Sequence, residues 1–350
     1  MTRIYLDHAA TSPLRPEAKA ALDEGFAMWA NPSSPHAEGR AARRALEDAR
    51  DRIKAALGWQ GEVIFTSGAS EAAALALGRA KAGARLVSAV EHDCILQAAP
   101  AAERLPVRPD GALDLDALQE AVQRERPLVA VQQVNSETGA AQDIAAVADI
   151  VDAAGGVLLV DAAQGAGKLP FPARADMVMV AAHKFGGPVG VGALLVEGFG
   201  LLEAGGGHER GYRRGTENLP GVMGMAAALE APADGYLQAG VEDALERLAD
   251  TVRGAGGVWL DDRLAGTTPF INALAMPGMS GTAQVMRFDM AGFAVSQGSA
   301  CSSGTMKTSH VLEAMGMDED LASRTIRMSV GWSTTAAQVD AFATAWKGLA

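Results

Sequence analysis

Cysteine is scarce in this 350-residue sequence, which contains only Cys94 and Cys301. Two cysteines are too few for a disulfide framework, and their positions do not give the spacing of a zinc site. Each is therefore expected to be either a small buried residue or a reactive thiol. The sequence also lacks any run of about 18 uncharged apolar residues, so no membrane-spanning helix is predicted.

Positive charge is also in short supply. The chain has 30 Lys and Arg against 42 Asp and Glu, for a net charge of −12, and no block of basic residues. A field of this sign repels nucleic acid and anionic membrane surfaces, so neither is expected as a partner. The first residues, MTRIYLDHAATSPL, contain no apolar signal region. A cytoplasmic location is therefore predicted.

Apolar residues make up 49% of the chain, and many of the 40 glycines stand at the ends of apolar runs. Short apolar runs alternate with helical patterns such as Gly39–Leu57 and Ile144–Ala154, which predicts an α/β fold with a mostly parallel sheet. Seven strands are expected in this sheet. Six of them are predicted at Val63–Thr66, Arg85–Val90, Leu128–Val134, Val157–Val160, Met177–Ala181 and Gly192–Val196.

The pattern changes after about residue 250. Further strands are predicted there at Val258–Leu260, Phe270–Ala275, Phe293–Ser296 and Thr325–Val330, with a Gly/Ser-rich loop at 298–304 and a terminal helix. We therefore expect a large domain at residues 14–250. A smaller α+β domain would combine residues 1–13 with residues 251–350.

Two side chains at predicted strand ends favour cofactor chemistry. Lys184 follows an apolar strand in AAHKFGGPVG, where an amine could attach an aldehyde cofactor. Asp161 ends the apolar strand of VLLVDAAQGAGK, and a carboxylate at such a place needs a positive partner. A protonated pyridine nitrogen is one such partner, and Gln164 could donate to the neighbouring ring oxygen. Taken singly, a surface lysine and a salt-bridged aspartate remain open readings.

Two loops add to this set. In EVIFTSGASEAAALAL a strand turns into a helix near Ala69, and the free N–H groups there, with the Ser70 hydroxyl, suit a phosphate. The segment has neither a Walker lysine nor the glycine pattern of a dinucleotide site. Cys301 lies in VSQGSACSSGTMKTSH, and a thiol among Gly and Ser is expected to be mobile and reactive. Cys94 lies in a helical apolar pattern and is interpreted as structural.

In order along the chain, these motifs resemble the cysteine desulfurases of the NifS/IscS kind, which are pyridoxal-phosphate enzymes similar to class V aminotransferases. The resemblance covers nearly the whole chain. The motifs that carry it are YLDHAATSPL, NPSSPH, TSGASE, VEHD, VNSETG, VDAAQGAGKLP, HKFGGPVGVGALL, GGGHERGYRRGTEN, GSACSS and TIRMSVG.

The resemblance implies a fold-type I homodimer that binds pyridoxal 5′-phosphate and converts L-cysteine to L-alanine. Lys184 would be the Schiff-base lysine, and Cys301 would accept the sulfur as a persulfide for a protein acceptor. Asp161 would pair with the pyridine nitrogen, while His92 would stack on the ring and serve in proton transfer. The other implied residues are Ala69, Ser70, His183 and the partner subunit's Thr216 for the phosphate, Gln164 for the ring oxygen, and Asn31 and Arg327 for the substrate carboxylate.

Three departures from the family pattern stand out. Ser136 replaces an asparagine near the cofactor ring, and Ala181 replaces a phosphate-binding serine. Each lost hydrogen bond costs about 0.5–3 kcal/mol, so weaker cofactor retention is expected. The sequence ends at Ala350, soon after its last helix, which puts a conventional role in iron–sulfur cluster biogenesis in question. Sulfur delivery to tRNA modification or to another carrier protein is the alternative.

Competing hypotheses stay open at this point. Another class V enzyme, such as a transaminase or a selenocysteine lyase, would share most of these residues. A transaminase needs no thiol, so it leaves the loop around Cys301 unexplained. A non-catalytic sulfur carrier or interaction protein needs none of Lys184, Asp161, His92 and Gln164, and their joint presence weighs against it.

Overall fold

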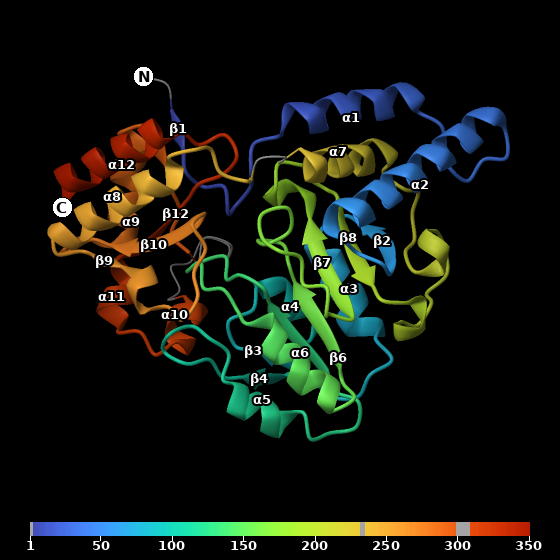
Figure 1. Cartoon of the computed structure of the whole chain (residues 1–350), viewed down its shortest axis with the longest axis horizontal. Helices are drawn as coiled ribbons and strands as arrows, with labels where there is room; N and C mark the ends of the chain where they lie inside the picture. The colour runs from blue at the N-terminus through green and yellow to red at the C-terminus, as the bar shows by residue number, and fades with distance from the viewer. Residues whose placement is uncertain (1–2, 232–234, 299–308) are drawn as a thin grey trace.

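The computed structural model describes residues 3–231, 235–298 and 309–350. Its centre is a seven-stranded sheet with strand order β2-β8-β7-β6-β5-β3-β4 (Figure 1). Only β8 runs antiparallel to its neighbours, so the predicted mostly parallel seven-stranded sheet is confirmed. The strands are β2 (Glu62–Thr66), β3 (Arg85–Ser88), β4 (Glu103–Leu105), β5 (Leu128–Gln132), β6 (Val157–Asp161), β7 (Met177–Ala181) and β8 (Gly192–Val196).

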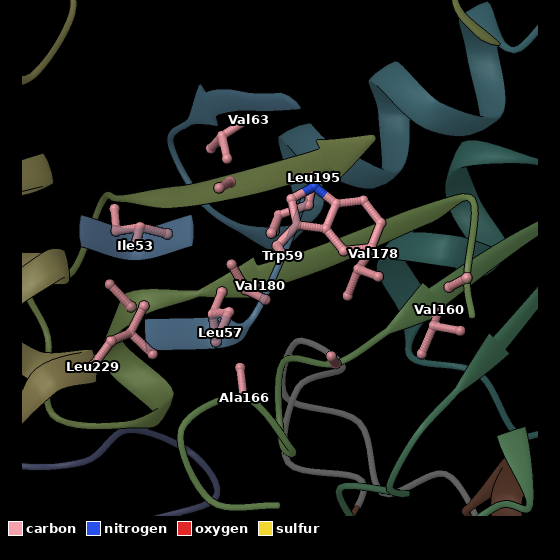
Figure 2. Close-up of a cluster of buried hydrophobic side chains, with 14 of the residues drawn as sticks. Ile53, Leu57, Trp59, Val63, Val160, Ala166, Val178, Val180, Leu195 and Leu229 are labelled. Atoms are coloured by element: carbon pink, nitrogen blue, oxygen red, sulfur yellow. The ribbon is translucent and has the colours of Figure 1, made fainter. Parts of the chain in front are cut away.

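Helices cover both faces of this sheet because alternate strand residues point to opposite sides and almost all are apolar. Val178 and Val180 of β7 belong to a core with α2 and α7, and Figure 2 shows these valines beside Ile53 and Leu57 of α2. Met177 and Met179 belong to a second core with α3 and α4. The helices are α1 (Pro16–Met28), α2 (Ala37–Leu57), α3 (Ala69–Arg79), α4 (Asp93–Ala98), α5 (Leu115–Ala121), α6 (Ile144–Ala153) and α7 (Leu219–Glu230).

Capping residues explain where several of these helices begin and end. The His36 ring accepts the Gly39 N–H at the start of α2, and Asp143 accepts the Ala146 N–H at the start of α6. Gly58 ends α2 in the left-handed conformation, with φ 66°. Within the described ranges, no helix has the length and apolar character needed to cross a membrane.

The remaining elements surround a smaller antiparallel sheet with strand order β12-β10-β9. Its core includes Leu248, Phe288, Ile326, Phe342 and Trp346, all of them fully buried. The strands are β9 (Val258–Trp259), β10 (Ile271–Ala275) and β12 (Thr325–Ser329). The helices are α8 (Val241–Gly254), α9 (Gly281–Met290), α10 (His310–Ala314), α11 (Glu319–Arg324) and α12 (Ala336–Leu349).

The N-terminal segment joins this smaller unit. Strand β1 (Ile4–Tyr5) pairs in parallel with β11 (Phe293–Ala294), and Asp7 forms a bridge with Ser329. Helix α8 packs on α12 and shares its core, although it begins before residue 251. The division into 14–250 and 1–13 with 251–350 stays a prediction, and we propose to move its second boundary ahead of α8.

Candidate functional site

Lys184 and Asp161 lie at the same edge of the large sheet, because each follows or ends a parallel strand. Asp161 is the last residue of β6. Lys184 ends a short 3₁₀ turn, η1 (Ala182–Lys184), that follows β7 directly. The Lys184 Nζ donates to the main-chain oxygens of Ala9, at 2.7 Å, and Ala10, at 3.0 Å. The amine is therefore held by the segment that comes from the smaller unit.

Asp161 is a buried carboxylate whose surroundings call for a cation. Its side chain is buried, and one oxygen, Oδ1, accepts the Ala163 N–H at 2.8 Å. Burial raises the pKa of Asp161, while that hydrogen bond and the charges of His92 and Lys184 lower it. A protonated ring nitrogen placed beside this carboxylate would remove the cost of burying it.

The two histidines of the predicted site are both oriented by hydrogen bonds. His92 is the N-cap of α4, and its Nδ1 accepts the Cys94 N–H at 3.2 Å, so the ring proton belongs on Nε2. His183 directly precedes Lys184, and its Nδ1 lies 3.2 Å from Thr11 Oγ1. Burial, followed by the charges of Lys184 and Lys168, lowers the pKa of His183 to about 4. His183 is therefore a neutral hydrogen-bonding group at pH 7.

The first turn of α3 carries Ala69 and Ser70, as predicted, after Gly68, whose positive φ of 152° is a conformation that only glycine adopts readily. The Ser67 N–H is already used by Glu71 Oε2 at 2.6 Å, so anion binding would depend on the next N–H groups and on the exposed Ser70 hydroxyl. Ala181 is buried at the end of β7 and supplies no hydroxyl.

Arg327 is engaged by protein groups in this structure. Its Nη2 donates to Asp7 Oδ1 at 2.7 Å and its Nη1 donates to the Ser136 main-chain oxygen at 2.8 Å. Its buried Nε has no hydrogen-bond partner among the described residues. The contact with Asp7 is a salt bridge, and binding of a substrate carboxylate by Arg327 stays a prediction.

Part of the predicted site lines a single cavity of about 720 Å³. Lys184, His92, Ser136 and Arg327 line it, together with the N-terminal residues Asp7, Ala9 and Ala10. Asn31 and Thr216 are exposed and do not line this cavity in the single chain. Cys301 lies outside the described residues, but Gly298, three positions before it, is part of the cavity wall.

The cavity also contains ionisable residues that sequence reasoning missed. Glu91 is fully buried, with Oε1 accepting the Gln132 N–H at 2.7 Å and Oε2 without a partner in the described chain. Burial, and then the charge of Asp161, raises the pKa of Glu91 well above its usual range. Arg104 and His310 line the same cavity. The only sequence signal for Glu91 was its position next to His92.

These groups fit the chemistry of pyridoxal phosphate. Lys184 offers an amine to an aldehyde, and the buried Asp161 offers a carboxylate to a protonated ring nitrogen. Gln164 is buried, and its Nε2 donates to the same Ala9 oxygen that Lys184 reaches, at 2.8 Å. The start of α3 can receive a phosphate.

The buried His8 is expected to make the stability of the protein depend on pH. Burial, and then the charge of Lys168, lowers its pKa to about 3, whereas an unfolded histidine titrates near 6.5. Between these values only the unfolded chain binds the proton, so acid lowers the free energy of unfolding, by about 1.4 kcal/mol per pH unit for one proton. We expect unfolding by urea to show this loss between pH 6.5 and 4, with a shallower slope in His8→Asn. An unchanged slope in that variant would contradict the assignment.

Comparison with known proteins gives a consistent match along the whole chain. The family model described as "Aminotransferase class-V" matches residues 4–342. A cysteine desulfurase of Cereibacter sphaeroides is 38% identical, covering 97% of this chain and 94% of its own length. The putative cysteine desulfurase IscS 1 of Bacillus subtilis (strain 168) is 34% identical, covering 97% of this chain and 96% of its own.

A solved structure of a NifS-like protein from Rickettsia africae ESF-5 superposes with a TM-score of 0.88 at 28% identity, and the match covers 99% of each chain. A structure titled "SspA in complex with cysteine" matches with a TM-score of 0.81 at 27% identity, over 95% of this chain and all of the other.

Proposed function

Because this chain belongs to the class V aminotransferase family, and its relatives at 34–38% identity include cysteine desulfurases over nearly their whole length, we propose that it is a cysteine desulfurase. The observation that carries the proposal is that Lys184 and His92 line the same cavity and both lie near the buried Asp161. L-cysteine is the substrate that this reading requires, and a solved relative is titled as a complex with cysteine.

Pyridoxal 5′-phosphate is the cofactor that the family implies. Lys184 would hold its aldehyde carbon, Asp161 its ring nitrogen and Gln164 its ring oxygen. Ala69, Ser70 and His183 would hold the phosphate, with the partner subunit's Thr216, and His92 would cover the ring. When bound, the cofactor supplies a positively charged ring that withdraws electrons from the substrate Cα.

Residues of the chain carry out the proton transfers and bind the substrate carboxylate. The Lys184 amine, placed at the cavity wall, removes the Cα proton of L-cysteine and returns it later. Asp161 keeps the ring nitrogen protonated, because its buried carboxylate is stabilised by that charge. Arg327 would exchange its contact with Asp7 for the substrate carboxylate, which its planar guanidinium binds well, with help from Asn31.

The sulfur transfer requires a thiolate, and Cys301 is the candidate. Its sulfur attacks the substrate sulfur, forming an S–S bond while the substrate C–S bond breaks and its electron pair stays on carbon. That carbon takes a proton, so L-cysteine and the Cys301 thiol yield L-alanine and a persulfide. The persulfide would then pass to a protein acceptor whose identity the residues do not specify.

The assembly and cellular role belong to the same proposal. A homodimer accounts for the position of Thr216, which is exposed and outside the cavity of its own chain. A supply of sulfur in the cytoplasm is the corresponding role, either for iron–sulfur clusters or, as the alternative, for tRNA modification or another carrier protein. A solved structure of a protein named DndA from Streptomyces lividans also matches, with a TM-score of 0.72 at 30% identity. The protein that accepts the sulfur is to be identified by experiment.

The direct test compares products from L-cysteine, with added thiol reductant, between wild type and Cys301→Ala. We expect wild type to release alanine and sulfide in equal amounts and the variant to release neither, because no thiolate remains to take the sulfur. Cys94→Ala is the matched control, since Cys94 is half-buried on α4 and should leave both products unchanged. Alanine and sulfide from Cys301→Ala at the wild-type rate would overturn the proposal, and amino-group transfer would then be tested.

A further inference from the structure

Lys168 is an ionisable residue that the proposed mechanism does not use. It lies in the turn after β6, and its Nζ is 3.4 Å from Gln164 Oε1. The Nζ also faces two aromatic rings, at 5.2 Å from the Tyr236 centroid and 5.0 Å from the Phe270 centroid. In the described chain no salt bridge joins Lys168 to a carboxylate. A lysine so placed, without a counter-charge, calls for an explanation other than an ion pair.

The contact with Gln164 decides which end of that amide faces the site. A primary amide has one accepting and one donating end of nearly the same shape, so only its partners distinguish the two. Lys168 can only donate, and it therefore takes the oxygen. The Gln164 Nε2 is left to donate at 2.8 Å to the Ala9 oxygen, which also accepts from Lys184 Nζ at 2.7 Å.

We propose that Lys168 is a positioning residue for the cofactor site: it fixes the donor end of Gln164 toward Lys184. This inference rests on the proposed function, because it concerns how the same site receives its cofactor. It adds a residue outside the cavity to those that would hold the aldehyde and the ring oxygen.

The charges around Lys168 leave Gln164 as its acceptor among the described residues. The titratable groups that act on it or respond to it are Lys184, His8, His183 and Tyr236. The pKa of His8 is lowered to about 3 and that of Tyr236 is raised to about 12, so both are neutral near pH 7. Burial, and then the charge of Lys184, lowers the pKa of Lys168 to about 7.

The ammonium form of Lys168, which can only donate, is therefore the main form below about pH 7. The hold on the Gln164 oxygen is strongest there, so cofactor binding is measured in that range.

The test uses Lys168→Met, which keeps most of the length of the side chain but loses the donor, and Lys168→Arg, which keeps a donor. Cofactor-free protein is mixed with pyridoxal phosphate at pH 6.5, and the equilibrium Kd is measured by absorbance. We expect Lys168→Met to weaken binding by about 3- to 10-fold, from one lost hydrogen bond. Lys168→Arg should restore the wild-type Kd.

Each other outcome has a defined meaning. A wild-type Kd in Lys168→Met would overturn the proposal and leave Lys168 a packing residue. Should Lys168→Met not fold, Lys168→Leu must show the same weaker binding, and a wild-type Kd there would refute the proposal. Failure of the wild type itself to capture pyridoxal phosphate would instead contradict the proposed function.

Discussion

Replacing Lys184 by alanine is expected to lower kcat/KM for L-cysteine at least about a thousandfold. In the proposed mechanism the amine both holds the aldehyde and acts as the base at Cα, and a positioned base alone contributes about 10²–10⁴-fold. The measurement is alanine production with pyridoxal phosphate present in excess, beside the thermal midpoint of the cofactor-free protein.

A second lysine serves as the matched control for this variant. Lys81 is exposed on a loop far along the chain from η1, and Lys81→Ala should retain wild-type activity. The midpoint of cofactor-free Lys184→Ala should lie close to that of the wild type, because the lost contacts are two hydrogen bonds to main-chain oxygens. Retention of more than a tenth of the wild-type rate would remove Lys184 from the catalytic centre.

The largest expected loss of stability comes from Arg50→Met. Arg50 on α2 forms two hydrogen bonds with Glu209, at 2.9 and 3.1 Å, and both side chains are buried. Glu209 Oε2 also accepts the Phe65 N–H at 2.9 Å, and the guanidinium lies 4.3 Å from the Phe65 ring centroid. Removing the arginine leaves a buried carboxylate unpaired, which costs about 3–5 kcal/mol of unfolding free energy.

The control comes from the same helix. Arg52 on α2 makes an equally close pair with Glu230, but both side chains are more than a third exposed, so Arg52→Met should cost less than about 1 kcal/mol. Urea unfolding of the cofactor-free protein measures both losses. The double variant Arg50→Met/Glu209→Gln should recover part of the loss, because no buried charge remains. Equal losses in the two single variants would show that burial does not decide the difference.

This ion pair also bears on the segment that carries Thr216. Glu209 and Arg210 adopt left-handed backbone conformations, with φ of 47° and 56°, which non-glycine residues rarely take. Such a conformation persists only where neighbouring contacts impose it. The Arg50–Glu209 pair supplies those contacts, and so it fixes the course of the chain toward Thr216.

Strands with strong local signals were the ones that the sequence predicted well. Met177–Ala181 and Gly192–Val196 are apolar runs buried along their whole length, and the structure has both with the predicted bounds. Strand β4 was missed because Glu103–Leu105 is a three-residue edge strand with two exposed charged residues. Nothing in so short a polar segment distinguishes a strand from a loop.

In the candidate site, too, residues with a local sequence signal were predicted and residues from distant segments were not. Asp161 and Lys184 were predicted to lie together because each is a polar residue at the end of an apolar run, and parallel strands bring such ends to the same edge of the sheet. The partners of these residues were not predicted: Ala9 and Ala10 hold Lys184 from 174 or more positions away. Lys168 was missed for the same reason, since the rings that surround it, Tyr236 and Phe270, belong to distant segments.

The pairing of β1 with β11 has a consequence for biosynthesis. The main-chain oxygens that bind Lys184 belong to Ala9 and Ala10, which are translated early. The residues that hold this N-terminal segment in place, Phe293 on β11 and Arg327 on β12, are translated near the end. The large sheet can assemble on the ribosome as its strands emerge, at about 5–20 residues per second. The contacts around Lys184 are complete only after Arg327 has been translated. A nascent chain that stalls earlier would contain the large sheet but not the complete candidate site.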